Sequence, residues 1–166
     1  MFSVGDTVSY GTQGICTIKE ISEMQIGKVK NKYYILVPVY DTKATIYVPT
    51  DNKKLVSNMR RLLSPAEINE LIDDAAATPM PWVENDLQRK ELCFAVIKSG
   101  NRTELMRLIS MLYLKREELK NSKKHFDISD ERFLRDAEKL LHDEFAYILG
   151  INQNEVSDYI LNRIKR

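Results

Sequence analysis

Ser64-Pro65-Ala66-Glu67 divides the 166-residue chain into two modules with different sequence periods. Serine followed three residues later by glutamate is a capping box, in which each side chain accepts a hydrogen bond from the other residue's backbone N–H, and proline suits the first helical position. Before this motif, short runs of β-branched and aromatic residues alternate with turns. After it, apolar residues recur every three or four positions, as in amphipathic helices. The motif therefore predicts an α+β protein with a domain boundary between residues 63 and 64.

The first module, residues 1–63, is predicted to contain four or five short strands. The segment 15–21 alternates in polarity, and the segment 32–39 is rich in aromatic and β-branched residues. Pro38 and Pro49 stand near strand ends, where proline is tolerated because it donates no hydrogen bond to a neighbouring strand. So many short strands in one small module indicate a strongly bent antiparallel sheet or a partly open barrel.

The second module, residues 64–166, is predicted to be a bundle of five helices joined by short connections. A connecting helix over 64–77 is followed by the linker 78–81, which cannot be helical because each proline restricts itself and the residue before it. A second helix is expected from about Trp82 to Lys98. The later boundaries rest on residues that begin or end helices, namely Asn101, Ser129, Gly150 and Asn152.

Charge is unevenly distributed along a chain whose net charge is only +1. Residues 1–63 carry nine Lys/Arg against five Asp/Glu, and the remainder carries sixteen against nineteen. Within that second part, residues 98–124 hold eight cations and three acids. This segment is either an ordinary solvated helix face or a basic patch on an otherwise neutral protein. The net charge itself excludes a global attraction to nucleic acid or membrane.

No catalytic or metal-binding pattern is found in the sequence. Cys16 and Cys93 lie far apart and are expected to be buried as small hydrophobic residues. His125 and His142 have no partner at metal-ligand or triad spacing and are expected to be ordinary surface or helix-face histidines. We therefore expect no enzyme, cofactor, metal or small-molecule substrate. No apolar run is long enough to span a membrane and no signal peptide is recognised, which favours a cytoplasmic protein.

Trp82, the only tryptophan, follows directly after the proline-rich linker. It is either a core anchor that holds the helical module together or a wedge offered to a partner. Apolar side chains inserted at a base step, with cations on the phosphates, are one way to hold distorted DNA through its minor groove. An edge strand of the first module offers a different kind of site, because it is a template for a partner's strand. Spacing alone leaves both readings of Trp82 open.

Several motifs occur in a specific order over nearly the whole chain. Residues 2–10, Phe2-Ser3-Val4-Gly5-Asp6-Thr7-Val8-Ser9-Tyr10, are followed by Tyr33-Tyr34-Ile35-Leu36, Ile46-Tyr47-Val48-Pro49 and Met59-Arg60-Arg61-Leu62. Trp82-Val83, Arg89 and the segment from Asp127 to Ala146 come next. This order resembles the CarD/CdnL family of bacterial RNA polymerase-binding transcription regulators. The first part is also similar to the polymerase-interacting domain of transcription-repair coupling factors, whose helicase motifs are absent here.

The resemblance implies a fold, a function and a set of site residues. The first domain would be a Tudor- or SH3-like antiparallel β-barrel that binds the β subunit of RNA polymerase through Lys43, Thr45 and Tyr47. The helical domain would contact promoter DNA beside the melted region, largely independently of sequence. Trp82 would enter the minor groove as a wedge and so stabilise the open complex. The other DNA contacts implied are Arg89, Lys123, Lys124, Arg132 and Arg135.

Two features depart from the family pattern. Tyr47 stands where some members have arginine, so the contact with polymerase is expected to be more apolar or to use Lys43. Glu84 and Asp86 follow Trp82 where some members have basic residues, and acids repel phosphates. We therefore expect poor DNA binding without polymerase. The alternative function is a protein–protein adaptor that docks through the first module, with Trp82 buried and no DNA contact.

Overall fold

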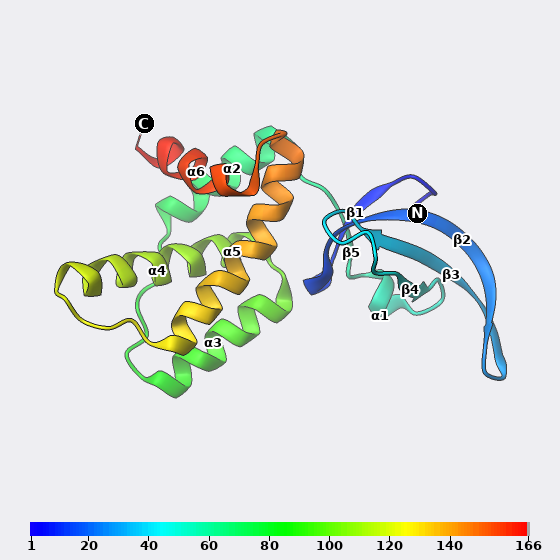
Figure 1. The fold of residues 1–166 in the computed structure, drawn as a ribbon, viewed down its shortest axis with the longest axis horizontal. Coiled ribbons are helices and arrows are strands. Elements are labelled where there is room, and N and C mark those ends of the chain that lie inside the picture. Colours follow the sequence, from blue (N-terminus) through cyan, green and yellow to red (C-terminus); the bar gives the residue numbers. More distant parts are fainter. Residues whose placement is uncertain (166) are drawn as a thin grey trace. The chain divides into compact units, whose positions relative to one another are not determined.

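A computed structural model of the chain describes residues 1–165. The chain divides into two compact units, Met1–Leu62 and Leu63–Arg166. Each unit has its own buried core. The architecture is mixed, with an antiparallel sheet in the first unit and helices dominating the second (Figure 1).

The first unit is a five-stranded antiparallel sheet with the strand order β4-β3-β2-β1-β5. The sheet is open, with β4 and β5 at its edges, so the closed form of the expected barrel is not seen. A 3₁₀ turn joins β1 to β2, and the short helix α1 lies between β4 and β5. The element bounds are β1 Thr7–Tyr10, β2 Gly14–Ile26, β3 Val29–Pro38, β4 Ile46–Pro49, α1 Lys53–Val56 and β5 Met59–Arg61.

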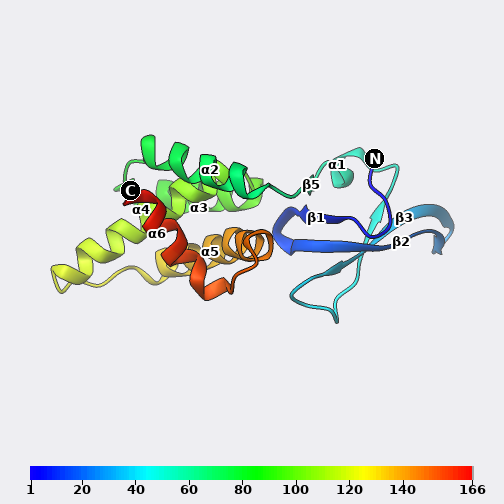
Figure 2. The same ribbon diagram turned by 90° about the horizontal axis from the view of Figure 1, so that it is seen from above.

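Strands β2 and β3 form a long, curved hairpin that runs beyond the rest of the sheet (Figures 1 and 2). The register shifts between Ile18 and Glu20, and such a bulge bends a strand and increases its twist. The core of the unit lies where the hairpin meets β1 and β4. Its buried members are Val8, Cys16, Ile18, Tyr34, Leu36, Val48 and Met59.

The second unit contains five α-helices among its described residues. Helix α4 packs against both α2 and α5, and α3 packs against α5. The largest buried side chains of the core include Ile68, Leu108, Leu134 and Phe145. No helix of residues 1–165 has the length and apolarity required to cross a bilayer. The helix bounds are α2 Pro65–Ala77, α3 Asp86–Ser99, α4 Arg102–Asn121, α5 Ile128–Leu149 and α6 Val156–Ile164.

Most helix boundaries agree with the capping residues. Ser64 and Glu67 form the reciprocal capping box, α2 ends at Ala77, and Asn101 caps α4 by accepting a hydrogen bond from the Glu104 N–H. Helices α3 and α5 end at Gly100 and Gly150, both in the left-handed conformation that glycine adopts without a steric penalty.

Two predicted helix starts are wrong. Helix α3 begins at Asp86 rather than near Trp82, because Asn85 is the residue that accepts a hydrogen bond from the Gln88 N–H. Helix α5 is capped by Asp127 rather than Ser129, since the Asp127 carboxylate accepts from the Ser129 N–H. Trp82 therefore lies in a non-helical segment, and its side chain is not aligned with Arg89 along one helix face.

Candidate nucleic-acid interface

Trp82 lies in the extended segment that joins α2 to α3. The segment begins after Thr78, which ends α2 with its backbone N–H bonded to the Asp74 carbonyl, and it ends where Asn85 caps α3. The Arg107 guanidinium donates a hydrogen bond to the Thr78 hydroxyl and so attaches the start of the segment to α4. The prolines keep the backbone extended between these points.

The Arg89 side chain holds the end of this segment from the interior of the unit. Its Nε donates to both carboxylate oxygens of Asp130, at 3.0 and 3.1 Å. Its Nη1 donates to the backbone carbonyls of Val83 and Glu84, at 2.9 and 3.3 Å. Its Nη2 donates to Asp86 Oδ1 at 2.8 Å. The hydrogen bond with Asp130 raises the pKa of Arg89 above its usual value, so the group is a permanent cation.

Two cations lie over the indole ring of Trp82. The Arg89 guanidinium carbon is 4.5 Å from the ring centroid, and Lys115 Nζ on α4 is 5.3 Å from it. Each distance is within the range in which the ring quadrupole attracts a cation, by about 0.5–2 kcal/mol. Trp82 is half-buried and packs against the core of the unit. Part of the side chain thus anchors the segment while part remains accessible.

Arg89 is not the surface residue that the sequence suggested. Only 3% of it is exposed and its donors are occupied within the protein, so in this conformation its guanidinium does not reach a phosphate. The same burial excludes a plain solvent-exposed arginine at this position. Sequence reasoning missed three residues at the site, Asp86, Asp130 and Lys115. Asp130 is 41 residues from Arg89, and no local pattern links them.

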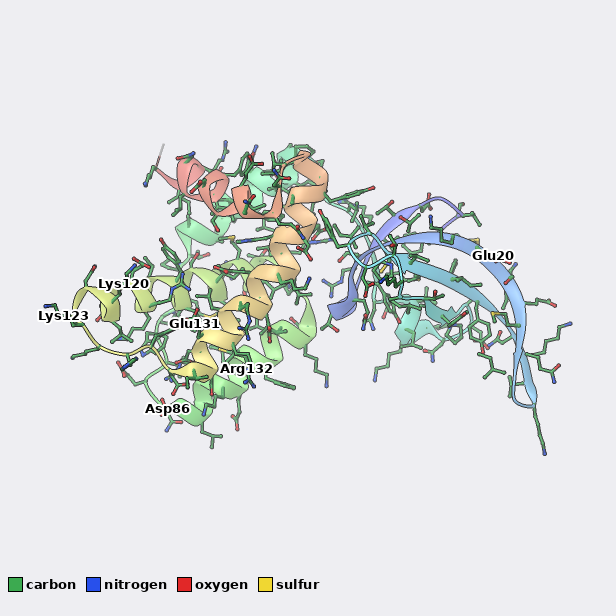
Figure 3. The ribbon with its side chains drawn as sticks, viewed as in Figure 1. Glu20, Asp86, Lys120, Lys123, Glu131 and Arg132 are labelled. Carbon is green, nitrogen blue, oxygen red and sulfur yellow. The ribbon has the colours of Figure 1, made fainter. Side chains whose placement is uncertain are left out.

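The other predicted DNA contacts are exposed. Lys123 and Lys124 follow the C-terminal end of α4, and Arg132 and Arg135 lie on the first half of α5. Figure 3 shows Lys120 and Lys123 at that end of α4, and Glu131 and Arg132 near the start of α5. The acids among them are partly neutralised, because Asp130 is paired with Arg89, and Glu131 Oε1 accepts from Arg116 at 3.1 Å.

Lys123 has an unusual backbone conformation. Its φ is 55°, and it is the one non-glycine residue with positive φ in the described chain. The Lys123 N–H bonds to the Lys120 carbonyl and the Lys124 N–H bonds to the Leu119 carbonyl, which together form a Schellman ending of α4. That position favours glycine, as at Gly100 and Gly150. A lysine there is held at a steric disadvantage of about 1–2 kcal/mol.

The predicted polymerase contacts lie at one edge of the first unit. Tyr47 is on the edge strand β4, opposite Ile35 of β3, and 46% of it is exposed. Lys43 and Thr45 precede that strand and are also exposed. An edge strand carries unpaired N–H and C=O groups that another strand can bond. The site therefore combines a backbone edge, one aromatic ring and one cation.

The two cores bury both cysteines and one of the two histidines. Cys16 and Cys93 are buried and unpaired as thiols, and burial raises the pKa of each to about 11. His142 is buried in α5 rather than on the surface, whereas His125 is exposed. Within residues 1–165, no three His, Cys, Asp or Glu side chains are grouped so that they can hold a metal ion.

Comparison with known proteins identifies the class of the first unit. Residues 2–63 match the CarD-like/TRCF RID domain family. The chain is also 25% identical over 164 residues to a Bacillus subtilis (strain 168) protein named "Putative transcription factor YdeB", a similarity that covers 96% of this chain and 99% of that protein. The first match identifies residues 2–63 as a domain of the RID type, and the second similarity extends over nearly the whole chain. These matches support the resemblance to the CarD/CdnL family.

Proposed function

We propose that the protein binds the β subunit of bacterial RNA polymerase through its first unit and stabilises the open promoter complex with Trp82. The observation that carries the proposal is the position of Trp82, which is half-buried in a non-helical segment with two cations over its ring. No reaction is catalysed in this scheme. Because polymerase acts in the cytoplasm, the protein works there too.

The first unit supports the polymerase contact. It matches a domain family named for CarD and the coupling factors, and Tyr47 is exposed on an edge strand. Strand addition at an edge gives affinity through main-chain hydrogen bonds, while the exposed side chains give specificity. With Tyr47 in place of an arginine, the side-chain contact is mainly apolar, and Lys43 supplies the positive charge.

The helical unit supports the DNA contact. A partly exposed tryptophan can enter a minor groove only where a base step is widened and unstacked, so it favours the DNA state that contains such a step. The exposed cations Lys123, Lys124, Arg132 and Arg135 are suited to phosphates, which position a protein without reading sequence. These cations contribute salt-dependent affinity for DNA, and that contribution is the same for promoters of different sequence.

The acids beside Trp82 make the DNA contact depend on polymerase. Glu84 is exposed, and the Asp86 side chain is 76% exposed even though it pairs with Arg89. These charges repel phosphates, so affinity for free DNA is weak. Binding to polymerase brings Trp82 to the fork at a high local concentration, which compensates for weak intrinsic affinity.

Trp82→Ala is expected to abolish the extension of open-complex lifetime that the wild-type protein produces with its cognate polymerase. The reason is that alanine cannot fill a widened base step. Each tenfold loss of lifetime corresponds to about 1.4 kcal/mol of lost stabilisation. The measurement is competitor-challenged decay of the open complex on a bacterial promoter.

The control is Leu87→Ala, which removes an exposed apolar side chain from the same unit and should leave the lifetime unchanged. Folding and polymerase binding of each variant are checked first, because Trp82 also packs against the core. If Trp82→Ala extends the lifetime as well as the wild type, the tryptophan is structural and the protein is an adaptor without a DNA contact. If neither protein extends it, the proposed role at the promoter fails.

Lys123→Gly is expected to raise the stability of the helical unit while weakening its contact with DNA. Glycine removes the steric penalty at positive φ, so the free energy of unfolding should rise by up to about 1 kcal/mol. The loss of one phosphate contact should shorten the open-complex lifetime and reduce the salt slope by about one. Lifetimes measured over a salt series test the second part. A variant that is stabilised but has an unchanged salt slope would show that Lys123 does not touch the phosphates.

A further inference from the structure

We infer that Arg89 and Asp130 are positioning residues that fix Trp82 in the conformation needed for insertion. This inference rests on the proposed function of Trp82. It differs from a DNA-contact role for Arg89, because the guanidinium and its carboxylate partner are 4% and 2% exposed and face the protein interior. In this inference neither Arg89 nor Asp130 contacts DNA.

The geometry ties Trp82 to two helices at once. Arg89 projects from α3 and its guanidinium lies over the Trp82 ring. The same guanidinium bonds the carbonyls of Val83 and Glu84, the two residues directly after Trp82. Asp130, in the first turn of α5, orients the guanidinium through two hydrogen bonds. The position of the ring is therefore coupled to the interface between α3 and α5.

The bonds from Arg89 matter because the segment that carries Trp82, between α2 and α3, has no helical hydrogen bonds of its own. Restricting the backbone of one residue to a single conformation costs enough entropy to weaken a binding constant by about five- to thirtyfold. If the segment were free, insertion into DNA would have to order it, and the apparent affinity would fall by that factor. Arg89 orders the segment before the protein meets DNA.

The key variant is the double substitution Arg89→Met/Asp130→Leu. It removes the hydrogen bonds to Val83 and Glu84 without leaving a buried charge unpaired, so the unit is expected to stay folded. In the free protein, acrylamide should quench Trp82 fluorescence more efficiently than in the wild type. With polymerase bound, the lifetime extension should fall at least about fivefold, with polymerase affinity unchanged.

Arg116→Met is the matched control. Arg116 also pairs with an acid of α5, Glu131, but it lies over Tyr113 rather than over Trp82. Neither quenching nor lifetime should change in this variant. Arg89→Lys keeps the positive charge, but an ammonium group cannot reproduce the hydrogen bonds of the planar guanidinium. Acrylamide quenching of Trp82 should therefore increase in this variant as well.

The two readouts distinguish failure of this inference from failure of the proposed function. Unchanged quenching in the folded double variant would overturn the positioning role, whatever the lifetimes are. Increased quenching with an unchanged lifetime, in a system where Trp82→Ala shortens it, would also overturn the inference. If Trp82→Ala itself has no effect on lifetime, the proposed function fails independently of the quenching result.

Discussion

Arg89→Met alone is expected to lower the free energy of unfolding of the helical unit by about 3–5 kcal/mol. The substitution leaves the Asp130 carboxylate buried, with 2% of its side chain exposed and no cation beside it. The desolvation of that charge is then uncompensated. Because whole domains are stable by about 5–15 kcal/mol, the loss is large enough to populate unfolded protein.

The double variant Arg89→Met/Asp130→Leu should recover most of this stability, since replacing both members of a buried ion pair by apolar residues is often neutral. Arg116→Met, which breaks a pair exposed by 32% and 48%, should cost no more than about 1 kcal/mol. Urea unfolding followed by far-UV circular dichroism measures all three, because the helices lie mainly in the second unit. Equal losses in the single and double variants would contradict the unpaired-charge explanation.

The boundaries that sequence predicted well depend on a few neighbouring residues. The Ser64 and Glu67 pair satisfies its own hydrogen bonds within three residues, so its structure is fixed locally. Gly150 likewise predicts a helix end, because glycine adopts positive φ without a steric penalty.

The two wrong helix starts also depend on neighbouring residues: α3 starts at its one good capping residue, whereas two capping residues compete at the start of α5. Asn85 provides a side-chain acceptor at the start of α3, whereas Trp82 has none. Asp127 and Ser129 are both good caps, and the structure uses the carboxylate of Asp127. Such a choice between neighbouring caps depends on how the following helix packs, which periodicity does not reveal.

The candidate site could be predicted only in part. Trp82 was recognised because a lone aromatic after a proline-rich linker is unusual. The network beneath it was not predicted, since Arg89 and Asp130 come from helices far apart in sequence. An arginine in a charged helix normally lies on the surface, and only the tertiary fold brings a buried carboxylate to it.

Acidification from pH 6.5 to about 4 is expected to destabilise the helical unit by about 3 kcal/mol through His142 alone. Burial lowers the pKa of His142 from 6.5 to about 4, and neighbouring Asp143 opposes this only partly. The side chain lies in a mostly apolar groove between α4, α5 and α6, lined by Ile109, Tyr113 and Ile160 among others. A charged imidazole is disfavoured there because it would lose its hydration.

The sign follows from proton uptake in the two states. Between pH 6.5 and 4, the unfolded chain protonates this histidine and the folded chain does not, so falling pH draws the protein toward the unfolded state. The stability that depends on a neutral His142 is fully present above pH 6.5 and is lost by about pH 4. Glu138, which lines the same groove, acts in the opposite direction: burial raises its pKa, so the folded state takes up that proton first and is stabilised as pH falls.

Comparing the wild type with His142→Leu isolates the histidine from this opposing effect. The variant removes the titrating group and keeps an apolar side chain in the groove, so its stability should fall less between the two pH values. His125→Leu is the matched control, because His125 is exposed. Urea unfolding of the helical unit at a pH above 6.5 and at one just above 4 measures the difference. Parallel loss of stability in wild type and His142→Leu would mean that the imidazole is not buried in its neutral form.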